Sequence, residues 1–244
     1  NLYQSGYVAG KLDLASLKFQ HGDFHELDRG FDFYAPQVFS HEGRVLLFGW
    51  MGMPEREEEY PTAAEGWLFS LTMPRELHLR DGKIFSAPPE EMKALRKGAP
   101  QVFEAAGTES FGQALAPKSE VELEIAFGEA QEVCIDLDYK ETGERMRLSY
   151  ARRTAVMTLD REGMKLGGRG VRRFRLEAAD SLKLQIYQDK TAIEVFFQEG
   201  AEAASFFVFP TEDVCPELRI SADGKLGKIE GKMWELGGFI WNAE

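Results

Sequence analysis

Residues 121–125 read VELEI, and in this stretch apolar and acidic side chains alternate strictly. A period of two places the apolar side chains on one face of a strand and the carboxylates on the other. Residues 182–186 (LKLQI) repeat the pattern, and residues 146–148 (MRL) continue it. About ten such strands, with turns every 8–12 residues, predict a two-sheet β-sandwich over residues 101–244.

The sequence before residue 87 also reads as strands, but in a different grouping. Four extended segments over about fifty residues match the size of one four-stranded propeller blade. Two more strands within residues 7–28, with His21-Gly22 between them, would be the remainder of a preceding blade. The four segments of the blade are 34–39, 44–50, 67–79 and 83–86.

One segment, residues 88–98 (PPEEMKALRKG), favours a helix. Two prolines precede it, acidic side chains fall in its first turn, and Gly98 follows its basic end. We therefore expect an all-β chain with propeller-like residues 1–87, a short helical linker at 88–100 and a β-sandwich at 101–244.

The charge of the chain argues against two classes of partner. The sequence has 29 lysines and arginines against 41 aspartates and glutamates, a formal net charge of −12. Nucleic acids and anionic membranes both attract a basic face, so neither is expected as a partner. No run approaches the roughly 20 apolar residues of a membrane span.

Neither a metal ion nor a cofactor is predicted. No glycine-rich phosphate loop opens a helix. Cys134 and Cys215 lie far apart and have no companion ligands at metal-binding spacing. His21 and His25 are four residues apart, but they flank a glycine in a strand context, which argues against a shared metal face.

Two segments hold the candidate site residues. In residues 30–37 (GFDFYAPQ), Asp32 lies between aromatic side chains at the entry to a strand. A carboxylate flanked by rings suits sugar binding, because it accepts hydrogen bonds from hydroxyls while the ring faces pack on C–H surface. An aspartate that caps a turn is the structural alternative. Trp50 ends an apolar run before a Gly- and Pro-rich loop, and either packs in the core or forms the wall of a pocket.

The string from Leu27 to Trp50 (LDRGFDFYAPQVF…GRVLLFGW) resembles the fifth-blade region of glycoside hydrolase family 32. Residues 61–77 continue the likeness, and residues 3–13 look like the strand that follows the family's acid/base motif. Residues 189–197 (DKTAIEVFF) are similar to the family's C-terminal sandwich signature. The likeness spans essentially the whole chain, and bacterial sucrose or sucrose-6-phosphate hydrolases are the most similar branch.

The resemblance implies a five-bladed β-propeller followed by a β-sandwich, of which this chain holds the last blade or blades and the sandwich. It also implies retaining hydrolysis of β-fructofuranosides by two carboxyl groups about 5 Å apart. The family's Asn-Asp-Pro, Arg-Asp-Pro and Glu-Cys motifs do not occur here, so the catalytic groups are expected upstream of Asn1 and the fragment alone is expected to be inactive. By the same resemblance Asp32 and Trp50 contact the substrate.

The resemblance leaves the fructoside open among sucrose, sucrose 6-phosphate and a fructan. The expected partners are this small carbohydrate and the upstream propeller segment; a homo-oligomer is left open, and the few cysteines and the bacterial likeness favour the cytoplasm. A rival function is a non-catalytic carbohydrate-binding module built on the sandwich. Exposed rings on a sandwich face would mark it, and the candidates are the pairs Phe196-Phe197 and Phe206-Phe207.

Overall fold

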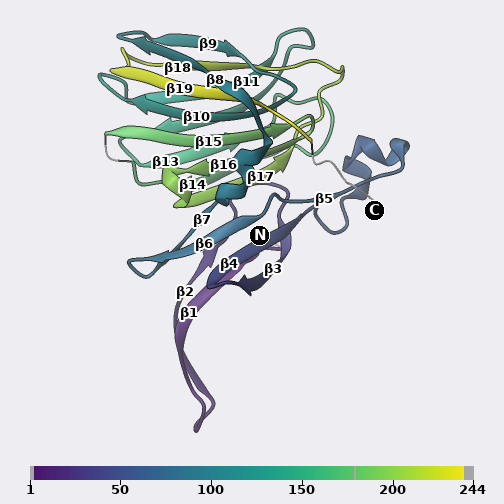
Figure 1. Cartoon of the computed structure of the whole chain (residues 1–244), viewed down its shortest axis with the longest axis vertical. Helices are drawn as coiled ribbons and strands as arrows, with labels where there is room; N and C mark the ends of the chain where they lie inside the picture. Colours follow the sequence, from purple (N-terminus) through teal and green to yellow (C-terminus); the bar gives the residue numbers. More distant parts are fainter. Residues whose placement is uncertain (1–2, 179, 239–244) are drawn as a thin grey trace.

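The chain folds almost entirely into antiparallel strands, arranged as a two-sheet β-sandwich and a smaller N-terminal part (Figure 1). The computed structural model describes residues 3–178 and 180–238, so residues 1–2, 179 and 239–244 of the predicted domains lie outside the described residues. The all-β class predicted from the sequence is confirmed. Within these described ranges, no helix has the length and apolar character needed to cross a membrane.

Each sheet of the sandwich has six strands, and the VELEI stretch lies in an inner strand of the first sheet. In order across the first sheet the strands are β17 (Glu202–Phe207), β16 (Ala192–Phe197), β15 (Ser181–Asp189), β10 (Lys118–Ala126), β19 (Lys228–Leu236) and β8 (Arg96–Ala106). Across the second sheet they are β14 (Val171–Arg175), β13 (Val156–Asp160), β12 (Glu144–Ala151), β11 (Glu132–Tyr139), β18 (Glu217–Ala222) and β9 (Ser110–Ala114).

The core lies between the two sheets because each strand turns one face inward. Val121, Leu123 and Ile125 of β10 are at most 3% exposed, and they pack in one cluster with Ile135 and Leu137 of β11. The acidic residues between them on β10 point to the other face of the sheet. The alternation read from the sequence therefore decides which side chains fill the core.

The N-terminal part contains a five-stranded antiparallel sheet, and four of its strands follow one another in one path, like the four strands predicted for a blade. In order these are β3 (Tyr34–His41), β4 (Arg44–Met51), β6 (Arg75–Arg80) and β7 (Lys83–Ala87), and the short β5 (Ser70–Leu71) pairs with β4. A closed five-bladed propeller needs further strands, so that part of the fold stays a prediction.

The predicted strand at 67–79 is broken between β5 and β6. Pro74 has no N–H to give to a strand ladder. The N–H of Met73 donates instead to the Glu194 carboxylate of the sandwich at 2.6 Å, so it is not available to β4. The longer connection from β4 to β5 contains two 3₁₀ helices, η1 (Glu57–Glu59) and η2 (Pro61–Glu65).

A long two-stranded hairpin, β1 (Gly6–Asp13) and β2 (Lys18–Glu26), projects from the body of the molecule (Figure 1). The turn predicted at His21-Gly22 is wrong, because both residues lie inside β2 and the chain turns at residues 14–17 instead. Asp13 fixes this turn, since its carboxylate accepts hydrogen bonds from the backbone N–H groups two and three residues further on, at 2.9 and 3.5 Å.

The helix predicted at 88–98 is shorter and tighter than expected. The segment forms a 3₁₀ helix, η3 (Glu90–Leu95), and β8 follows directly from Arg96. Arg96 holds the extended chain on the sheet, because its guanidinium donates to the Glu120 carboxylate at 2.6 and 2.7 Å and lies 3.7 Å from the centre of the Trp234 ring. The sandwich sheet therefore begins inside the predicted linker.

Glu144, at the start of β12, ties two loops to the sandwich. Its side chain is fully buried and accepts hydrogen bonds from the backbone N–H groups of Lys165 at 2.9 Å and Thr211 at 2.8 Å, and from the Thr211 hydroxyl at 2.8 Å. Burial alone would raise the pKa of this carboxyl, but the three donors favour its charged form, and the net effect lowers the pKa below 4.5.

Replacing Glu144 with Gln is expected to lower stability at neutral pH and to flatten the acid side of the stability profile. A carboxyl with a depressed folded pKa stabilises the fold above its unfolded pKa, near 4.5, and this contribution is lost as the pH falls through the folded value. Thermal melts from pH 7 to pH 3 should therefore show the Tm values of wild type and E144Q converging below about pH 4.5. A constant gap would contradict this role, and Glu141→Gln at an exposed neighbour is the control.

Candidate functional site

Asp32, the first predicted site residue, is buried where the N-terminal part meets the sandwich. It is 1% exposed, and protein groups donate three hydrogen bonds to its carboxylate. The donors are the Tyr60 hydroxyl at 2.9 Å, Arg161 Nη1 at 2.8 Å and the backbone N–H of Phe207 at 2.9 Å. Burial and the nearby Asp32 charge raise the pKa of Tyr60, so its phenol stays protonated and donates.

This environment speaks against the predicted contact between Asp32 and a sugar. Both carboxylate oxygens are occupied by protein donors, and Arg161 is itself only 3% exposed. Breaking a buried ion pair of this kind costs about 3–5 kcal/mol, and a hydrogen bond to a sugar hydroxyl stabilises by less than this. The alternative considered from the sequence, an aspartate that caps a turn, does not describe the residue either, because its donors are the distant residues Tyr60, Arg161 and Phe207. The flanking rings that suggested sugar binding pack inward instead, since Phe31 and Phe33 are each 7% exposed.

The segment around Asp32 extends the edge of the first sandwich sheet alongside β17. The N–H of Arg29 donates to the Ala203 carbonyl at 2.7 Å, and the N–H of Asp32 donates to the Ser205 carbonyl at 3.2 Å. Gly30 lies between these contacts, where a Cβ atom would come within 1.9 Å of the Ser205 carbonyl oxygen. Only glycine permits this approach, so Gly30 allows the N-terminal segment to lie this close to β17.

A second buried ion cluster, formed by Asp28, Arg75, Glu194 and Ser205, joins the same two parts. Arg75 Nη2 donates to Asp28 Oδ2 at 2.8 Å and to Glu194 Oε2 at 2.9 Å, and it also contacts the Ser205 hydroxyl. Burial alone would lower the pKa of Arg75, but the two carboxylates raise it, so the guanidinium stays charged. One carboxylate comes from each part, so this Arg75 cluster holds the N-terminal part on the sandwich.

Trp50, the second predicted site residue, lies partly exposed near the end of β4. Its ring centroid is 6.2 Å from that of Tyr34, its partner across β3, and 4.7 Å from that of Phe69. Tyr3 packs on Tyr34 with a centroid distance of 5.5 Å. These four partly exposed side chains form an aromatic cluster, whose ring faces are suited to packing against sugar C–H groups.

The sequence reasoning missed Tyr34 and Phe69 as neighbours of Trp50. Regular pairing of β3 with β4 across the turn at Glu42-Gly43 would put Tyr34 opposite Met51. A register shift between Tyr34 and Gln37, which the sequence pattern did not indicate, puts it opposite Trp50. Phe69 lies in the irregular connection between β4 and β5, where no sequence periodicity predicts which side chain packs against the sheet. The tertiary fold therefore brings these rings together, and no local sequence motif predicts the cluster.

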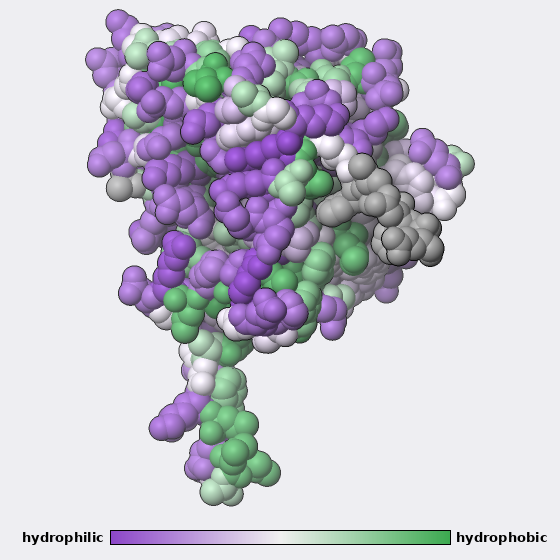
Figure 2. All heavy atoms as spheres, viewed as in Figure 1, coloured by the Kyte–Doolittle hydropathy of each residue, from purple (hydrophilic) through white to green (hydrophobic). Residues whose placement is uncertain are grey.

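The projecting hairpin exposes an apolar face (Figure 2). Val8, Leu12, Phe19 and Phe24 are 40–53% exposed. Val8 pairs with Phe24 and Leu12 pairs with Phe19, and cross-strand partners share a face of a hairpin. Exposed apolar surface of this kind is typical of interaction surfaces.

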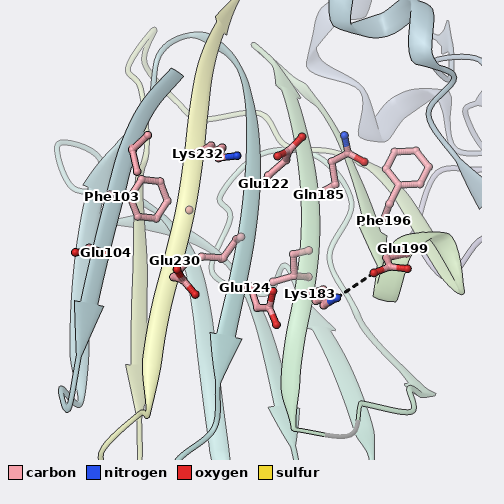
Figure 3. A pocket seen from close by; sticks show the side chains of 14 residues that line it. Phe103, Glu104, Glu122, Glu124, Lys183, Gln185, Phe196, Glu199, Glu230 and Lys232 are labelled. Carbon is pink, nitrogen blue, oxygen red and sulfur yellow. Dashed lines mark hydrogen bonds and ion pairs between the residues drawn. The ribbon is translucent and has the colours of Figure 1, made fainter. Parts of the chain in front are cut away.

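An open groove of about 480 Å³ lies on the outer face of the first sandwich sheet (Figure 3). Charged and apolar residues both line it, and Lys183 Nζ pairs there with Glu199 Oε1, from η4 (Gln198–Gly200), at 3.0 Å. The charged and amide side chains that line it are Glu104, Glu122, Glu124, Lys183, Gln185, Glu199, Glu230 and Lys232.

The rings predicted to mark a carbohydrate-binding module are not exposed. Phe196, Phe197, Phe206 and Phe207 are at most 3% exposed, and Phe103 at the wall of the groove is 8% exposed. Phe197 and Phe206 fill the sandwich core, whereas Phe196 and Phe207 face the N-terminal part. The prediction that these pairs present a sugar-binding face is wrong, because the second face of the sheet is covered where they lie.

Comparison with known proteins identifies the family. The family model for the glycosyl hydrolases family 32 N-terminal domain matches residues 1–88, and the model for the family 32 C-terminal domain matches residues 91–235. These matches, with the sandwich and the blade-like sheet, place the chain among the glycoside hydrolases. It belongs to glycoside hydrolase family 32, which confirms the resemblance seen in the sequence.

The chain is similar to several curated sucrose-6-phosphate hydrolases. It is 35% identical to that of Staphylococcus xylosus over 221 residues, which cover 87% of this chain and 44% of the relative. It is 31% identical to that of Bacillus subtilis over 246 residues, which cover 97% of this chain and 48% of the relative. The chain thus spans just under half the length of these relatives.

Solved structures of the family share the fold. A Bombyx mori GH32 β-fructofuranosidase superposes with a TM-score of 0.79 at 24% identity, covering 97% of this chain and 47% of that structure. The sucrose-6-phosphate hydrolase of Lactobacillus gasseri gives a TM-score of 0.77 at 23% identity, covering 95% of this chain and 47% of that structure. At this identity the likeness establishes the architecture alone.

Replacing Arg75 with Ala is expected to destabilise the protein by about 3–5 kcal/mol, because Asp28 and Glu194 would remain buried without their cation. Arg80→Ala is the matched control, since Arg80 lies on the same strand but is exposed, and it should change stability by about 0.5 kcal/mol or less. Urea unfolding followed by tryptophan fluorescence measures both variants. Equal losses in the two variants would contradict the role given to the Arg75 cluster.

Proposed function

We propose that this chain is the C-terminal part of a retaining β-fructofuranosidase that hydrolyses sucrose, sucrose 6-phosphate or a related fructoside. One observation carries the proposal: both halves of the family 32 model match in order along the chain, at residues 1–88 and 91–235. The curated relatives support it, since they are sucrose-6-phosphate hydrolases of about twice this length.

The catalytic carboxylates are proposed to lie in the polypeptide that precedes this chain in the whole protein. Retaining hydrolysis needs two carboxyl groups about 5 Å apart beside the sugar. Asp28 and Glu194 do converge, but both bind the buried Arg75 guanidinium and are inaccessible to a sugar. The family's nucleophile and acid motifs are absent from the sequence, which supports their location upstream.

The upstream polypeptide is also the proposed partner of the exposed hairpin. A two-stranded hairpin is marginally stable by itself in water, and β1 and β2 pair only with each other among the described residues. Strands from the same protein that cover Val8, Leu12, Phe19 and Phe24 would bury this apolar face. Such packing would continue the blade-like sheets toward a closed propeller, as the resemblance implies.

Trp50 is the proposed sugar-contacting residue of this chain. The aromatic cluster gives it two ring neighbours and leaves it partly exposed, so a fructoside ring can pack on the cluster without opening the core. The burial of Asp32 leaves it the role of holding this region on the sandwich. A cytoplasmic location remains a prediction from the sequence, and the oligomeric state stays open.

Release of reducing sugar from sucrose and sucrose 6-phosphate tests the proposal. The 244-residue chain, with its intact mass verified, should show no turnover. The longer natural polypeptide that contains it should hydrolyse at least one of the two substrates. Turnover by the short chain would overturn the location of the carboxylates, and an inactive long polypeptide on both substrates and on a fructan would overturn the function.

In the active long polypeptide, Trp50→Ala is expected to lower kcat/KM by about tenfold or more, equivalent to about 1.4 kcal/mol of transition-state stabilisation. The loss follows from removing a ring face from the sugar site, so Trp50→Phe should recover most of it. Trp67→Ala is the control, because Trp67 is a second exposed tryptophan of the same part and lies outside the aromatic cluster. Steady-state kinetics in which the two alanine variants behave alike would contradict the role of Trp50.

A further inference from the structure

Four aromatic rings follow one another from the edge of the sandwich to the partly exposed Trp50. The first is Phe207 of β17, which is 3% exposed, and the Tyr60 ring lies edge-on to it with a centroid distance of 5.6 Å. Phe69 lies edge-on to Tyr60 at 5.1 Å, and Trp50 lies edge-on to Phe69 at 4.7 Å. The interplanar angles along this aromatic row are 79–88°, a geometry that the negative face and positive edge of a ring favour.

The sandwich fixes the inner end of the aromatic row. Tyr60 is 4% exposed, and its hydroxyl donates to Asp32 Oδ1 at 2.9 Å. A second buried ring, Phe209, packs on Tyr60 at a centroid distance of 6.1 Å. Tyr60 cannot leave this orientation without breaking a buried hydrogen bond, so it offers Phe69 a single edge-on position.

The pairing of β5 with β4 and one glycine determine the outer end of the row. Leu71 of β5 pairs with Trp50, so Phe69, two residues before Leu71, is a diagonal neighbour of Trp50 on the same face. A Cβ atom at Gly52 would come within 2.6 Å of Phe69 Cδ1 and 2.7 Å of Trp50 Cε2. The two rings therefore occupy the space that a side chain at position 52 would need, and they pack directly against the backbone there.

We propose that Phe69 is a positioning residue for Trp50, which holds the indole in the one plane in which its face packs on the fructoside. This role rests on the proposed sugar contact of Trp50. A side chain that is restrained before binding loses less freedom when the substrate binds, and a misplacement of about 1 Å can lower a rate by about a hundredfold. Phe69 supplies the restraint, and Tyr60 and Phe207, which are too buried to reach a sugar, connect it to the sandwich.

The order of the Trp50 indole in the 244-residue chain tests the positioning role directly. The ¹⁵N order parameter of its N–H, assigned by the signal lost in Trp50→Phe, should fall from about 0.85 to below about 0.6 in Phe69→Leu. Phe69 is partly exposed, so this variant is expected to fold, and Phe69→Tyr keeps the ring and should keep the order. Phe39→Leu is the matched control, because the Phe39 ring of the same sheet stacks on Phe48 instead. An indole that stays ordered in Phe69→Leu, or that loses order equally in Phe39→Leu, would overturn the proposal.

A double-mutant cycle in the active long polypeptide gives a second readout. With Trp50 intact, Phe69→Leu should lower kcat/KM by about fivefold or more, and Phe69→Tyr should recover most of the loss. In the Trp50→Ala background, Phe69→Leu should have almost no further effect on kcat/KM, because the ring that it positions is gone. Losses that simply multiply would overturn the proposal, since Phe69 would then act without Trp50. So would a lower Tm with an unchanged kcat/KM, which a purely structural role predicts.

The sugar contact and the positioning role fail separately in these measurements. If Trp50→Ala leaves kcat/KM unchanged, the proposed sugar contact of Trp50 is wrong, whatever Phe69→Leu does to the order of the indole. If Trp50→Ala lowers kcat/KM and Phe69→Leu does not, the sugar contact stands and the positioning role of Phe69 is overturned.

Discussion

The structure depends on one buried cation, Arg75, that neither of its two parts can hold alone. A guanidinium without solvent is strongly unfavourable unless carboxylates surround it at hydrogen-bonding distance. Asp28 supplies one carboxylate from the N-terminal part, and Glu194 supplies the other from the sandwich. Charge balance is therefore reached only when the two parts are docked, which makes the docked arrangement the stable one.

A second buried ion pair between the two parts, Arg161 with Asp32, determines the geometry of the candidate sugar site. Arg161 of the sandwich holds Asp32, and two residues later Tyr34 begins the strand that places it opposite Trp50. The sandwich thus acts on the site from a distance, by fixing the segment that leads into β3. The sandwich therefore helps to position the segment that carries Tyr34 into β3.

The sequence was informative where one face of a strand is buried and misleading where two parts of the protein meet. The alternation in residues 121–125 predicted a sandwich strand, because period two follows from burial on one side. The break at Pro74 and the burial of Asp32 both depend on partners in the sandwich, Glu194 and Arg161, more than a hundred residues away. Propensity and local pattern contain no information about such partners.

The long separation along the chain also sets an order for biosynthesis. Asp28 lies 177 residues before Ser205, so a ribosome adding about 5–20 residues per second reaches the serine roughly 10–35 s after the aspartate. During that interval the carboxylates and the guanidinium of the N-terminal part cannot be buried, because their partners in the sandwich have not been made. The N-terminal part can therefore dock only after the sandwich has been completed. A polypeptide released earlier would expose these charged groups and would be recognised by proteases and chaperones.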